Sequence, residues 1–224
     1  MPVRVRKPPT RILLARHGQT ESNREGRFCG HSETDLTELG RQQARALGER
    51  LANVAIDAAY TSDFSRAIET AALVLGARGI TAAVDPGLRE LHYGEWEMVK
   101  NGDVAKRYPV QYQLMRAEDP AWHPPGGENI AMVRARTFAA LHGIARAHQH
   151  QTVLIVAHGT AINCMLAEVL GMAPTHTFRV AVDNCALSEL VLRRTTPIVV
   201  RLNDTSHLAG VSASRKPRSA GAQA

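Results

Sequence analysis

Residues 12–20 read Ile-Leu-Leu-Ala-Arg-His-Gly-Gln-Thr, and this stretch decides both the fold and the position of a candidate site. The apolar run 12–15 has the length and flanks of a buried strand. It ends in Arg16-His17-Gly18, and in open α/β sheets such strand ends border the ligand crevice. The planar guanidinium group of arginine donates paired hydrogen bonds to phosphate, and glycine lets a ligand approach the backbone closely. The stretch therefore suggests a nucleophilic histidine aimed at a phosphoryl group.

A second apolar run ends in the same way. Residues 152–157 read as a strong buried strand, and His158-Gly159 follows it directly, before a helix expected over 161–170. Strand ends of a parallel sheet share one edge, so we expect the two histidines to face one crevice. Phosphoryl transfer through a histidine needs an unprotonated imidazole nitrogen, cations around the phosphoryl oxygens and an acid for the leaving oxygen.

The cation and the acid have candidates near the same edge. Arg66 lies at the start of a helix that follows a short strand, where a helix N-terminus also favours an anion. Glu90 follows the strand expected over 80–84 and is the candidate acid. Glu95 and Glu97 stand in the same loop, and spacing alone does not choose among the three carboxylates.

Strand-like and helix-like segments alternate along the chain, which favours an α/β layer fold. Residues 19–35 are expected to be a polar loop, and 88–127 to be an excursion over the active site with a helical middle. The pattern predicts strands at 12–15, 58–61, 80–84, 152–157, 186–192 and 198–202, and helices from Thr37 to about 54, at 64–75, at 128–148 and at 161–170.

The length of 224 residues suits one domain, which we expect over 11–208, between a flexible N-terminus (1–10) and a disordered tail (209–224). Seven of the 27 basic residues lie near the two ends, so the body of the chain is close to neutral against 21 acidic residues. A nucleic-acid-binding fold needs a basic face, so we expect no nucleic-acid partner.

The remaining composition bears on location and assembly. No apolar stretch approaches the roughly 20 residues of a membrane span. The three cysteines are sparse and form no Cys-x-x-Cys pair, and the first residues lack the apolar core of a secretory signal, so we expect a cytoplasmic protein. The edge strands and the segment 98–120 leave a homodimer open.

Several ordered blocks together resemble the histidine phosphatase superfamily, in the branch of cofactor-dependent phosphoglycerate mutases and α-ribazole phosphatases. The resemblance runs from about Arg11 to about Leu202 and implies an α/β three-layer sandwich with a mostly parallel central sheet flanked by helices. The blocks are Arg16-His17-Gly18-Gln19-Thr20 with Asn23, residues 26–30, residues 36–40, Thr61-Ser62 with Arg66-Ala67 and Thr70-Ala71, Glu90 with Gly94 and Trp96-Glu97, residues 125–128, and Ala157-His158-Gly159.

The resemblance implies a role for each matching position. His17 would be the phosphorylated nucleophile, and Glu90 would protonate the leaving alkoxide and then activate water. The phosphate pocket would be formed by Arg16, Arg66 and His158. The substrate would be hydrogen-bonded by Asn23 and by groups at Cys29, Gly30, Gly159 and Thr160. The family's reaction uses no metal, and we expect no other cofactor, because the arginines supply the positive charge.

Three functions fit this site. We expect a metal-independent phosphomonoesterase that hydrolyses a small phosphorylated metabolite through a phosphohistidine. A cofactor-dependent phosphoglycerate mutase is the alternative: residues 92–94 resemble the mutases, whereas 94–97 resemble phosphatases and 98–125 is short for a mutase insert. A catalytically silent binding or regulatory module on the same fold is the alternative of another class, and the retained site residues speak against it. Substrate choice depends on the loops 28–35 and 92–125.

Overall fold

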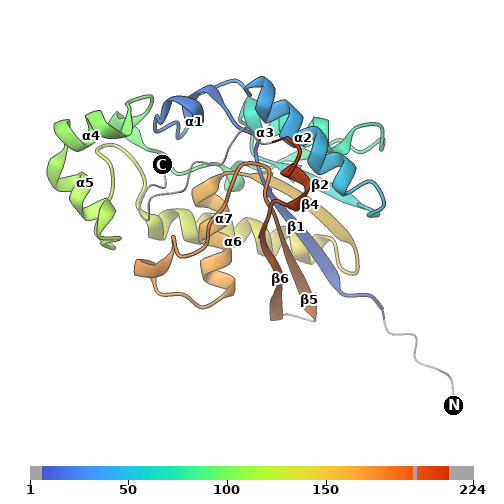
Figure 1. Cartoon of the computed structure of the whole chain (residues 1–224). Helices are drawn as coiled ribbons and strands as arrows, with labels where there is room; N and C mark the ends of the chain where they lie inside the picture. The colour runs from blue at the N-terminus through green and yellow to red at the C-terminus, as the bar shows by residue number, and fades with distance from the viewer. Residues whose placement is uncertain (1–6, 194–195, 212–224) are drawn as a thin grey trace, which may run out of the picture.

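The computed structural model describes residues 7–193 and 196–211 and contains a six-stranded sheet of order β3-β2-β4-β1-β5-β6 (Figure 1). Strands β1 to β4 are mutually parallel, whereas β5 pairs antiparallel with both β1 and β6. The strands are β1 (Thr10–Arg16), β2 (Ala58–Thr61), β3 (Ala83–Val84), β4 (Thr152–Ala157), β5 (Leu187–Arg193) and β6 (Thr196–Asp204). The prediction of an α/β fold with a mostly parallel central sheet is confirmed.

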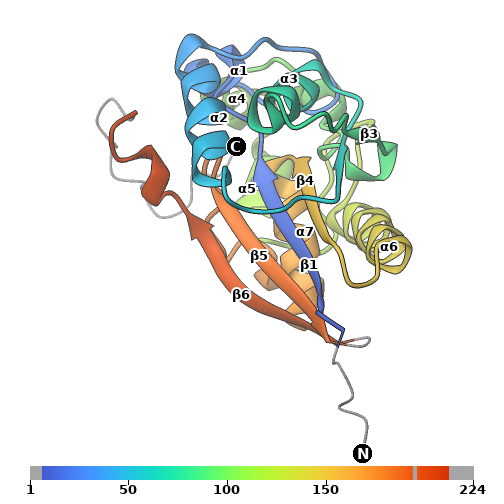
Figure 2. The same cartoon turned by 90° about the vertical axis from the view of Figure 1, so that its right-hand side faces the viewer.

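Helices cover both faces of the sheet, α2 and α3 on one and α6 and α7 on the other (Figures 1 and 2). The α-helices are α1 (Glu21–Glu25), α2 (Glu38–Arg50), α3 (Ser65–Leu75), α4 (Asn101–Arg107), α5 (Pro109–Arg116), α6 (Ile130–Ala147) and α7 (Gly159–Val169). Single 3-10 turns occur at Pro86–Leu88, Gly94–Trp96, Pro174–His176 and Ser206–Leu208. None of the helices in the described residues is long and apolar enough to cross a bilayer.

Strand β1 contributes to both halves of the core. Ile12 and Leu14 pack in the cluster formed with α6 and α7, and Leu13 and Ala15 pack in the cluster formed with α2 and α3. Successive side chains of a strand point to opposite faces, so a strand covered on both sides is apolar throughout. This explains the continuous run that identified the strand in the sequence.

The loop after β1 crosses the first turn of α2 at van der Waals distance. A Cβ on Gly18 would lie 2.4 Å from the carbonyl oxygen of Gly40, and a Cβ on Gly40 would lie 2.1 Å from that of Gln19. Thr37 caps α2 by accepting from the Gly40 N–H, and the Gly18 N–H donates to Thr70 Oγ1 on α3. Two glycines without side chains thus allow the loop that carries His17 to lie directly against two helices.

Three predicted elements differ from the structure. The expected loop 19–35 contains the five-residue helix α1, which Thr20 and Asn23 start with a reciprocal capping box and Gly26 ends in a left-handed conformation. One and a half turns are too short to give a helical period. The strand expected over 80–84 is only Ala83–Val84, at the edge of the sheet, and α7 begins at Gly159 rather than at 161.

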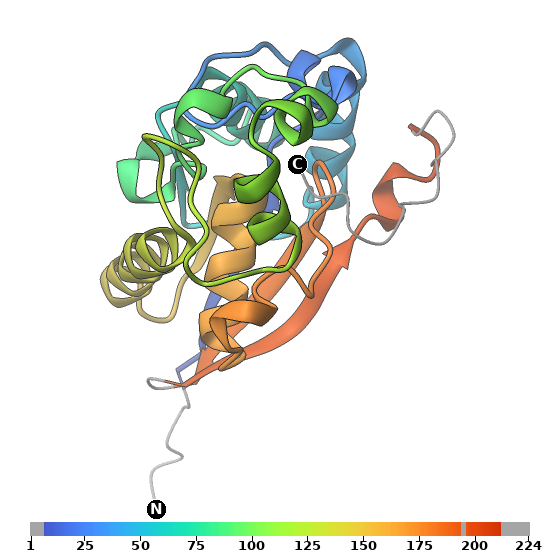
Figure 3. The same cartoon turned by 90° about the vertical axis from the view of Figure 1, so that its left-hand side faces the viewer.

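The excursion 88–127 packs on the domain through its own apolar cluster (Figure 3). The ring of Phe28 packs at a tilt against those of Tyr93 and Trp96, and Trp96 also contacts Trp122. The Phe28 N–H donates to the Val99 carbonyl at 3.1 Å and the Met98 N–H donates to the Phe28 carbonyl at 2.6 Å, which ties the excursion to the loop after α1. Most of the predicted terminal segments, residues 1–6 and 212–224, lies outside the described residues, while β1 already begins at Thr10.

Candidate active site

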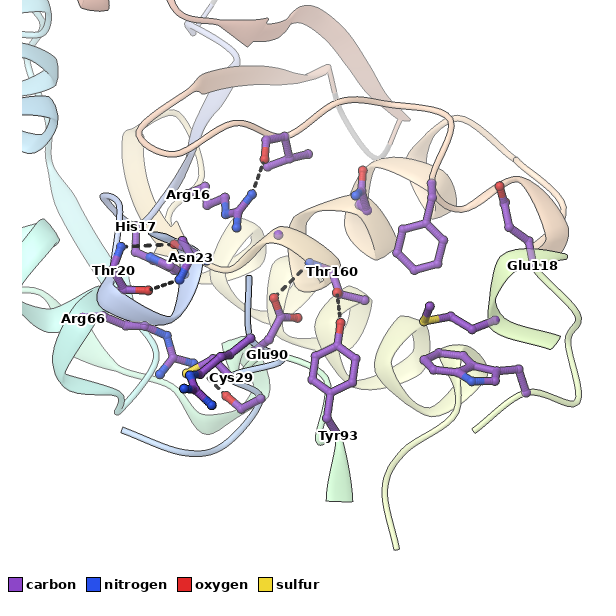
Figure 4. Close-up of a pocket in the computed structure, with 18 of the residues that line it drawn as sticks. Arg16, His17, Thr20, Asn23, Cys29, Arg66, Glu90, Tyr93, Glu118 and Thr160 are labelled. Atoms are coloured by element: carbon purple, nitrogen blue, oxygen red, sulfur yellow. Dashed lines mark hydrogen bonds between the residues drawn. The ribbon is translucent and has the colours of Figure 1, made fainter. Parts of the chain in front are cut away.

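A cavity of about 270 Å³ lies at the carboxyl ends of β1 and β4 (Figure 4). Of the ten residues predicted for the site, His158 alone is absent from its wall. The other nine, drawn from segments far apart in the chain, are Arg16, His17, Asn23, Cys29, Gly30, Arg66, Glu90, Gly159 and Thr160. The edge of the sheet therefore brings the predicted residues together.

His17 is held as a neutral imidazole. Its Nδ1 lies 2.7 Å from the Gly18 carbonyl oxygen, and a carbonyl only accepts, so Nδ1 carries the proton and Nε2 the lone pair. The residue is 4 % exposed. Burial, followed by the charges of Arg66 and Arg16, holds the pKa of His17 well below its usual value. Nε2 is thus available as a nucleophile at neutral pH.

His158 lies behind the wall, its ring centroid 5.1 Å from that of His17. Arg66 Nε donates to His158 Nδ1 at 3.3 Å, so the ring proton is on Nε2, which donates to Ser62 Oγ at 2.7 Å. Burial, followed by the charge of Arg66, holds the pKa of His158 well below its usual value. In this structure His158 supports Arg66 and His17 from behind.

Arg66 supplies a buried positive charge from the first turn of α3. It is 1 % exposed, and its Nη1 and Nη2 donate to the carbonyl oxygens of Ser32 and Gly30 at 2.9 and 2.7 Å. None of its three acceptors is a carboxylate, so these bonds orient the guanidinium without neutralising it. Arg16 adds a second guanidinium, whose Nη1 donates to the Val182 carbonyl at 2.7 Å.

Glu90 is fixed by two backbone donors. Its Oε1 accepts from the Leu91 N–H at 2.7 Å and its Oε2 accepts from the Thr160 N–H at 3.1 Å (Figure 4). The Thr160 N–H, to which the resemblance assigns substrate binding, donates to Glu90 in this structure. The reason is that the first N–H groups of a helix have no partner within the helix, and the nearest acceptor is this carboxylate. Tyr93 Oη, 3.5 Å from Thr160 Oγ1, adds to the same wall.

Asn184 is a site residue that the sequence did not reveal. Its Nδ2 donates to the His17 carbonyl at 3.0 Å and to Asn23 Oδ1 at 3.1 Å. Asn23 Oδ1 also accepts from the Thr20 N–H. Because both of these bonds use the amide oxygen, the NH₂ group of Asn23 remains as the donor toward the cavity. Asn184 lies just before β5, and only the pairing of β5 with β1 brings it beside His17.

The loop at Cys29 and Gly30 is shaped by Glu97. Gly30 has a left-handed backbone (φ +57°), and a Cβ there would lie 2.4 Å from Glu97 Oε1. That oxygen accepts from the His31 N–H at 2.8 Å. Cys29 Sγ donates to the Ser32 carbonyl, and burial raises the pKa of its thiol, so Cys29 is a protonated wall residue.

The far end of the cavity contains residues that the sequence did not single out. The excursion and the loop after α7 contribute Met115, Arg116, Glu118, Trp122, Phe178 and Arg179. In Figure 4 Glu118 lies across the cavity from His17 and Asn23. Among residues 7–193 and 196–211, no three His, Cys, Asp or Glu side chains are grouped to hold a metal ion.

The site agrees with what the chain resembles among known proteins. The chain is 33 % identical to the solved structure of Bacillus stearothermophilus YhfR. The two superpose with a TM-score of 0.86, and the match covers 89 % of this chain and 99 % of the YhfR chain. It is 27 % identical to phosphoserine phosphatase 1 of Hydrogenobacter thermophilus, over 88 % of this chain and 94 % of the relative. It is 30 % identical to the probable phosphoglycerate mutase GpmB of Yersinia pestis, over 88 % and 94 %.

The family model of the histidine phosphatase superfamily (branch 1) matches residues 12–205. This range includes the two strand-end histidines, Glu90, and the arginines Arg16 and Arg66. Family match, relatives and cavity agree with one another and with the sequence prediction. The chain is an enzyme of the histidine phosphatase type and belongs to branch 1 of the histidine phosphatase superfamily.

Proposed function

We propose that the protein is a phosphomonoesterase that passes the phosphoryl group of a small ester to His17 and then to water. The observation that carries this proposal is the state of His17, a neutral ring with Nδ1 bound to the Gly18 carbonyl and an unprotonated Nε2, in one cavity wall with Arg66 and Arg16. An unprotonated nitrogen beside two guanidinium groups is suited to attack on a dianionic phosphate.

In the first step Nε2 of His17 attacks phosphorus, a P–N bond forms and the P–O bond to the alcohol breaks. Arg16 and Arg66 stabilise the charge on the non-bridging oxygens, and the Asn23 NH₂ group donates to one of them. Glu90 gives its proton to the leaving oxygen. Its two backbone hydrogen bonds keep the carboxyl group in place without occupying every lone pair, so the same group can also carry a proton.

In the second step a water molecule attacks the phosphohistidine. Glu90, now ionised, takes a proton from this water, the P–N bond breaks and its electron pair returns to Nε2. Inorganic phosphate leaves, and both His17 and Glu90 regain their starting protonation states. The two arginines provide the positive charge in both steps.

The test is direct trapping of the intermediate. Rapid quenching with a ³²P-labelled aryl phosphate should label wild-type protein with a phosphate that is stable to base and labile to acid, and His17→Ala should remain unlabelled. His142→Ala, which changes a histidine of α6 outside the cavity wall, is the matched control and should label normally. Turnover by the wild type without any labelled protein would contradict the proposal.

The mutase alternative is favoured by the relative named probable phosphoglycerate mutase. It predicts exchange of 2- and 3-phosphoglycerate that depends on a bisphosphate primer. The phosphomonoesterase proposal predicts release of inorganic phosphate from a panel of esters without such exchange. A silent module would show the same background rate in wild type and in His17→Ala.

The assignment extends to partners and location. A small phosphorylated metabolite is the expected partner, since the cavity is only about 270 Å³. A cytoplasmic location, the absence of a nucleic-acid partner and a homodimer through an edge strand or the segment 98–120 stay predictions. Light scattering at micromolar concentration tests the dimer.

A further inference from the structure

We propose that Arg136 on α6 and Glu128 are positioning residues that hold Glu90 in place for proton transfer to the leaving oxygen. This inference rests on the proposed function and adds to it the residues on which that proton transfer depends. It also gives a role to the block 125–128, which the chemical steps do not use. Arg136 and Glu128 both lie outside the cavity wall, so they act through Glu90.

Glu90 takes its position from the backbone around it. Both hydrogen bonds to its carboxylate come from backbone N–H groups, one from Leu91, next in the chain, and one from Thr160. Residues 89–93 are neither helix nor strand, so no regular hydrogen-bond ladder holds this segment. A displacement of about 1 Å in a reacting group can cost about 100-fold in rate. The segment therefore needs side chains that fix its backbone.

Arg136 contacts this segment through three backbone carbonyl groups. Its Nη1 donates to the Arg89 carbonyl at 2.6 Å and to the Gly87 carbonyl at 3.2 Å, and its Nη2 donates to the Glu90 carbonyl at 2.8 Å. His31 Nε2 donates to the same Glu90 carbonyl at 2.9 Å. Because a guanidinium group is planar and its N–H groups point in fixed directions, these bonds fix the backbone before and at Glu90 relative to α6.

Glu128 holds the guanidinium of Arg136 in this orientation. The two side chains form a bidentate pair, with Nε to Oε1 and Nη2 to Oε2 both at 2.8 Å. Glu128 Oε2 also accepts from the His92 N–H at 3.0 Å, two residues after Glu90. Burial raises the pKa of Glu128, but the hydrogen bonds from Arg136 and His92 outweigh it and place that pKa below its usual value. The pair therefore stays ionised at neutral pH and adds no net charge behind Glu90.

The block 125–128 brings Glu128 to this place because its backbone lies directly against residues 92–95. The Glu128 N–H donates to the His92 carbonyl at 2.9 Å. A Cβ on Gly127 would lie 2.3 Å from the same carbonyl oxygen, so a side chain there would push the block away. The glycine thus permits the contact through which Glu128 and Arg136 reach the segment of Glu90.

The inference predicts how the rate depends on the leaving group. An alkoxide leaves poorly and needs the proton from Glu90, whereas 2,4-dinitrophenolate leaves without one. Loss of the positioning should therefore slow hydrolysis of 2-phenylethyl phosphate much more than hydrolysis of 2,4-dinitrophenyl phosphate. A purely structural loss would slow both alike, because both esters use the same nucleophile and the same arginines.

The test measures kcat/KM for these two esters and compares the alkyl-to-aryl ratio between variants. Glu90→Gln should lower the ratio by about 100-fold or more, the scale of losing a general acid. Arg136→Met should lower it by about tenfold or more, because the acid is present but misplaced. Arg136→Lys keeps the charge opposite Glu128 but not the planar fork, and should lower it by about threefold or more. Because both rates come from one protein sample, loss of folded protein cancels in the ratio.

Arg134→Met is the matched control. Arg134 lies on the same helix and is buried, but it donates to the Glu168 carboxylate and to the Met172 carbonyl instead of to the segment of Glu90. This variant should keep the wild-type ratio. The double variant Glu90→Gln with Arg136→Met should have the ratio of Glu90→Gln alone, because a positioning residue has no effect once the group that it positions is gone.

The outcomes separate the two proposals. If wild type hydrolyses neither ester, or if Glu90→Gln keeps the wild-type ratio, the proposed function fails and the positioning role fails with it. If Glu90→Gln lowers the ratio while both Arg136 variants keep it, the positioning role is overturned and the phosphomonoesterase proposal stands. The same holds if Arg134→Met lowers the ratio as much as Arg136→Met, or if the double variant falls below Glu90→Gln.

Discussion

The two ends of the cavity are built differently. At the phosphate end His17, Arg66 and His158 are at most 4 % exposed, and each side chain is held by at least one hydrogen bond to a backbone carbonyl or to a buried side chain. At the far end Arg179 is 62 % exposed, and Glu118 has a buried oxygen without a partner. A preorganised end suits a step common to all phosphate esters. A wall built from loops tolerates sequence change more readily than the sheet does.

The difference follows from where the residues originate. Arg16 and Ala157 are register partners in adjacent parallel strands, so the ends of β1 and β4 place His17 and His158 as neighbours. The far wall comes from an excursion and from the loop after α7, which the sheet does not hold in register. The residues of the two ends thus come from separate parts of the chain.

The largest expected contrast is between arginines at the two ends. Arg66→Lys removes bonds to the carbonyls of Gly30 and Ser32 and should lower kcat/KM by about 10²–10³, the scale of losing a preorganised donor. Arg179→Lys should lower it by no more than about threefold, because an exposed charge contributes little. Steady-state kinetics on one aryl phosphate measures both, and equal losses would erase the distinction between the ends.

The pH dependence probes the buried imidazoles. The folded-state pKa values of His17 and His158 lie well below their usual values, chiefly because of burial. Both rings therefore stay neutral on acidification to pH 6.5, and the acid limb of kcat/KM should begin well below that pH. It should then fall about tenfold per pH unit, after correction for ionisation of the substrate. An acid limb centred at 6.5 or above would contradict a buried neutral nucleophile.

The free energy of unfolding, like the activity, should fall when the pH is lowered. Below pH 6.5 the unfolded chain protonates these histidines while the folded chain does not, so the unfolded state binds more protons. Above pH 6.5 the two histidines therefore do not lower the free energy of unfolding. Below pH 6.5 they lower it progressively, until the pH reaches their depressed folded-state pKa values. Urea unfolding at pH 7.5, 6.5 and 5.5 measures this, and His17→Gln should show a smaller decline than wild type.

A glycine pair compares a packed loop with an open one. Gly30→Ala and Gly126→Ala both place a side chain at positive φ, which costs about 1 kcal/mol or more. Only at Gly30 does the new Cβ also meet an atom, Glu97 Oε1 at 2.4 Å, which adds about 1–3 kcal/mol for overpacking. Denaturant unfolding should give a lower free energy of unfolding for Gly30→Ala than for Gly126→Ala. Only Gly30→Ala should impair turnover.

The last expected effect concerns Asn184. Asn184→Ala removes the hydrogen bonds to the His17 carbonyl and to Asn23 Oδ1, so kcat/KM should fall about tenfold, as expected for about 1–1.5 kcal/mol of lost positioning. KM should change less than kcat, because Asn184 acts through its neighbours. The control Asn53→Ala changes an exposed residue in the turn after α2 and should stay within about twofold of wild type.

Much of the fold follows from local pattern. The run 12–15 is buried on both faces, so its apolar character is unbroken and easy to interpret, and the same holds for 153–157. Short elements are not predicted by such patterns. Helix α1 owes its start to a capping box between Thr20 and Asn23 rather than to periodicity, and β3 survives as two residues at an edge.

The sequence by itself determined most of the sheet and its helical cover, because buried strands are unbroken apolar runs and amphipathic helices show an apolar period. It also predicted the residues of the phosphate end, because the strand-end blocks stand in a family order. Only the tertiary structure decided that Asn184 holds His17, that the Thr160 N–H donates to Glu90 and that Glu118 and Trp122 share a wall with His17. These are contacts between distant segments, and their partners are set by strand pairing and by packing of an excursion, which no local pattern encodes.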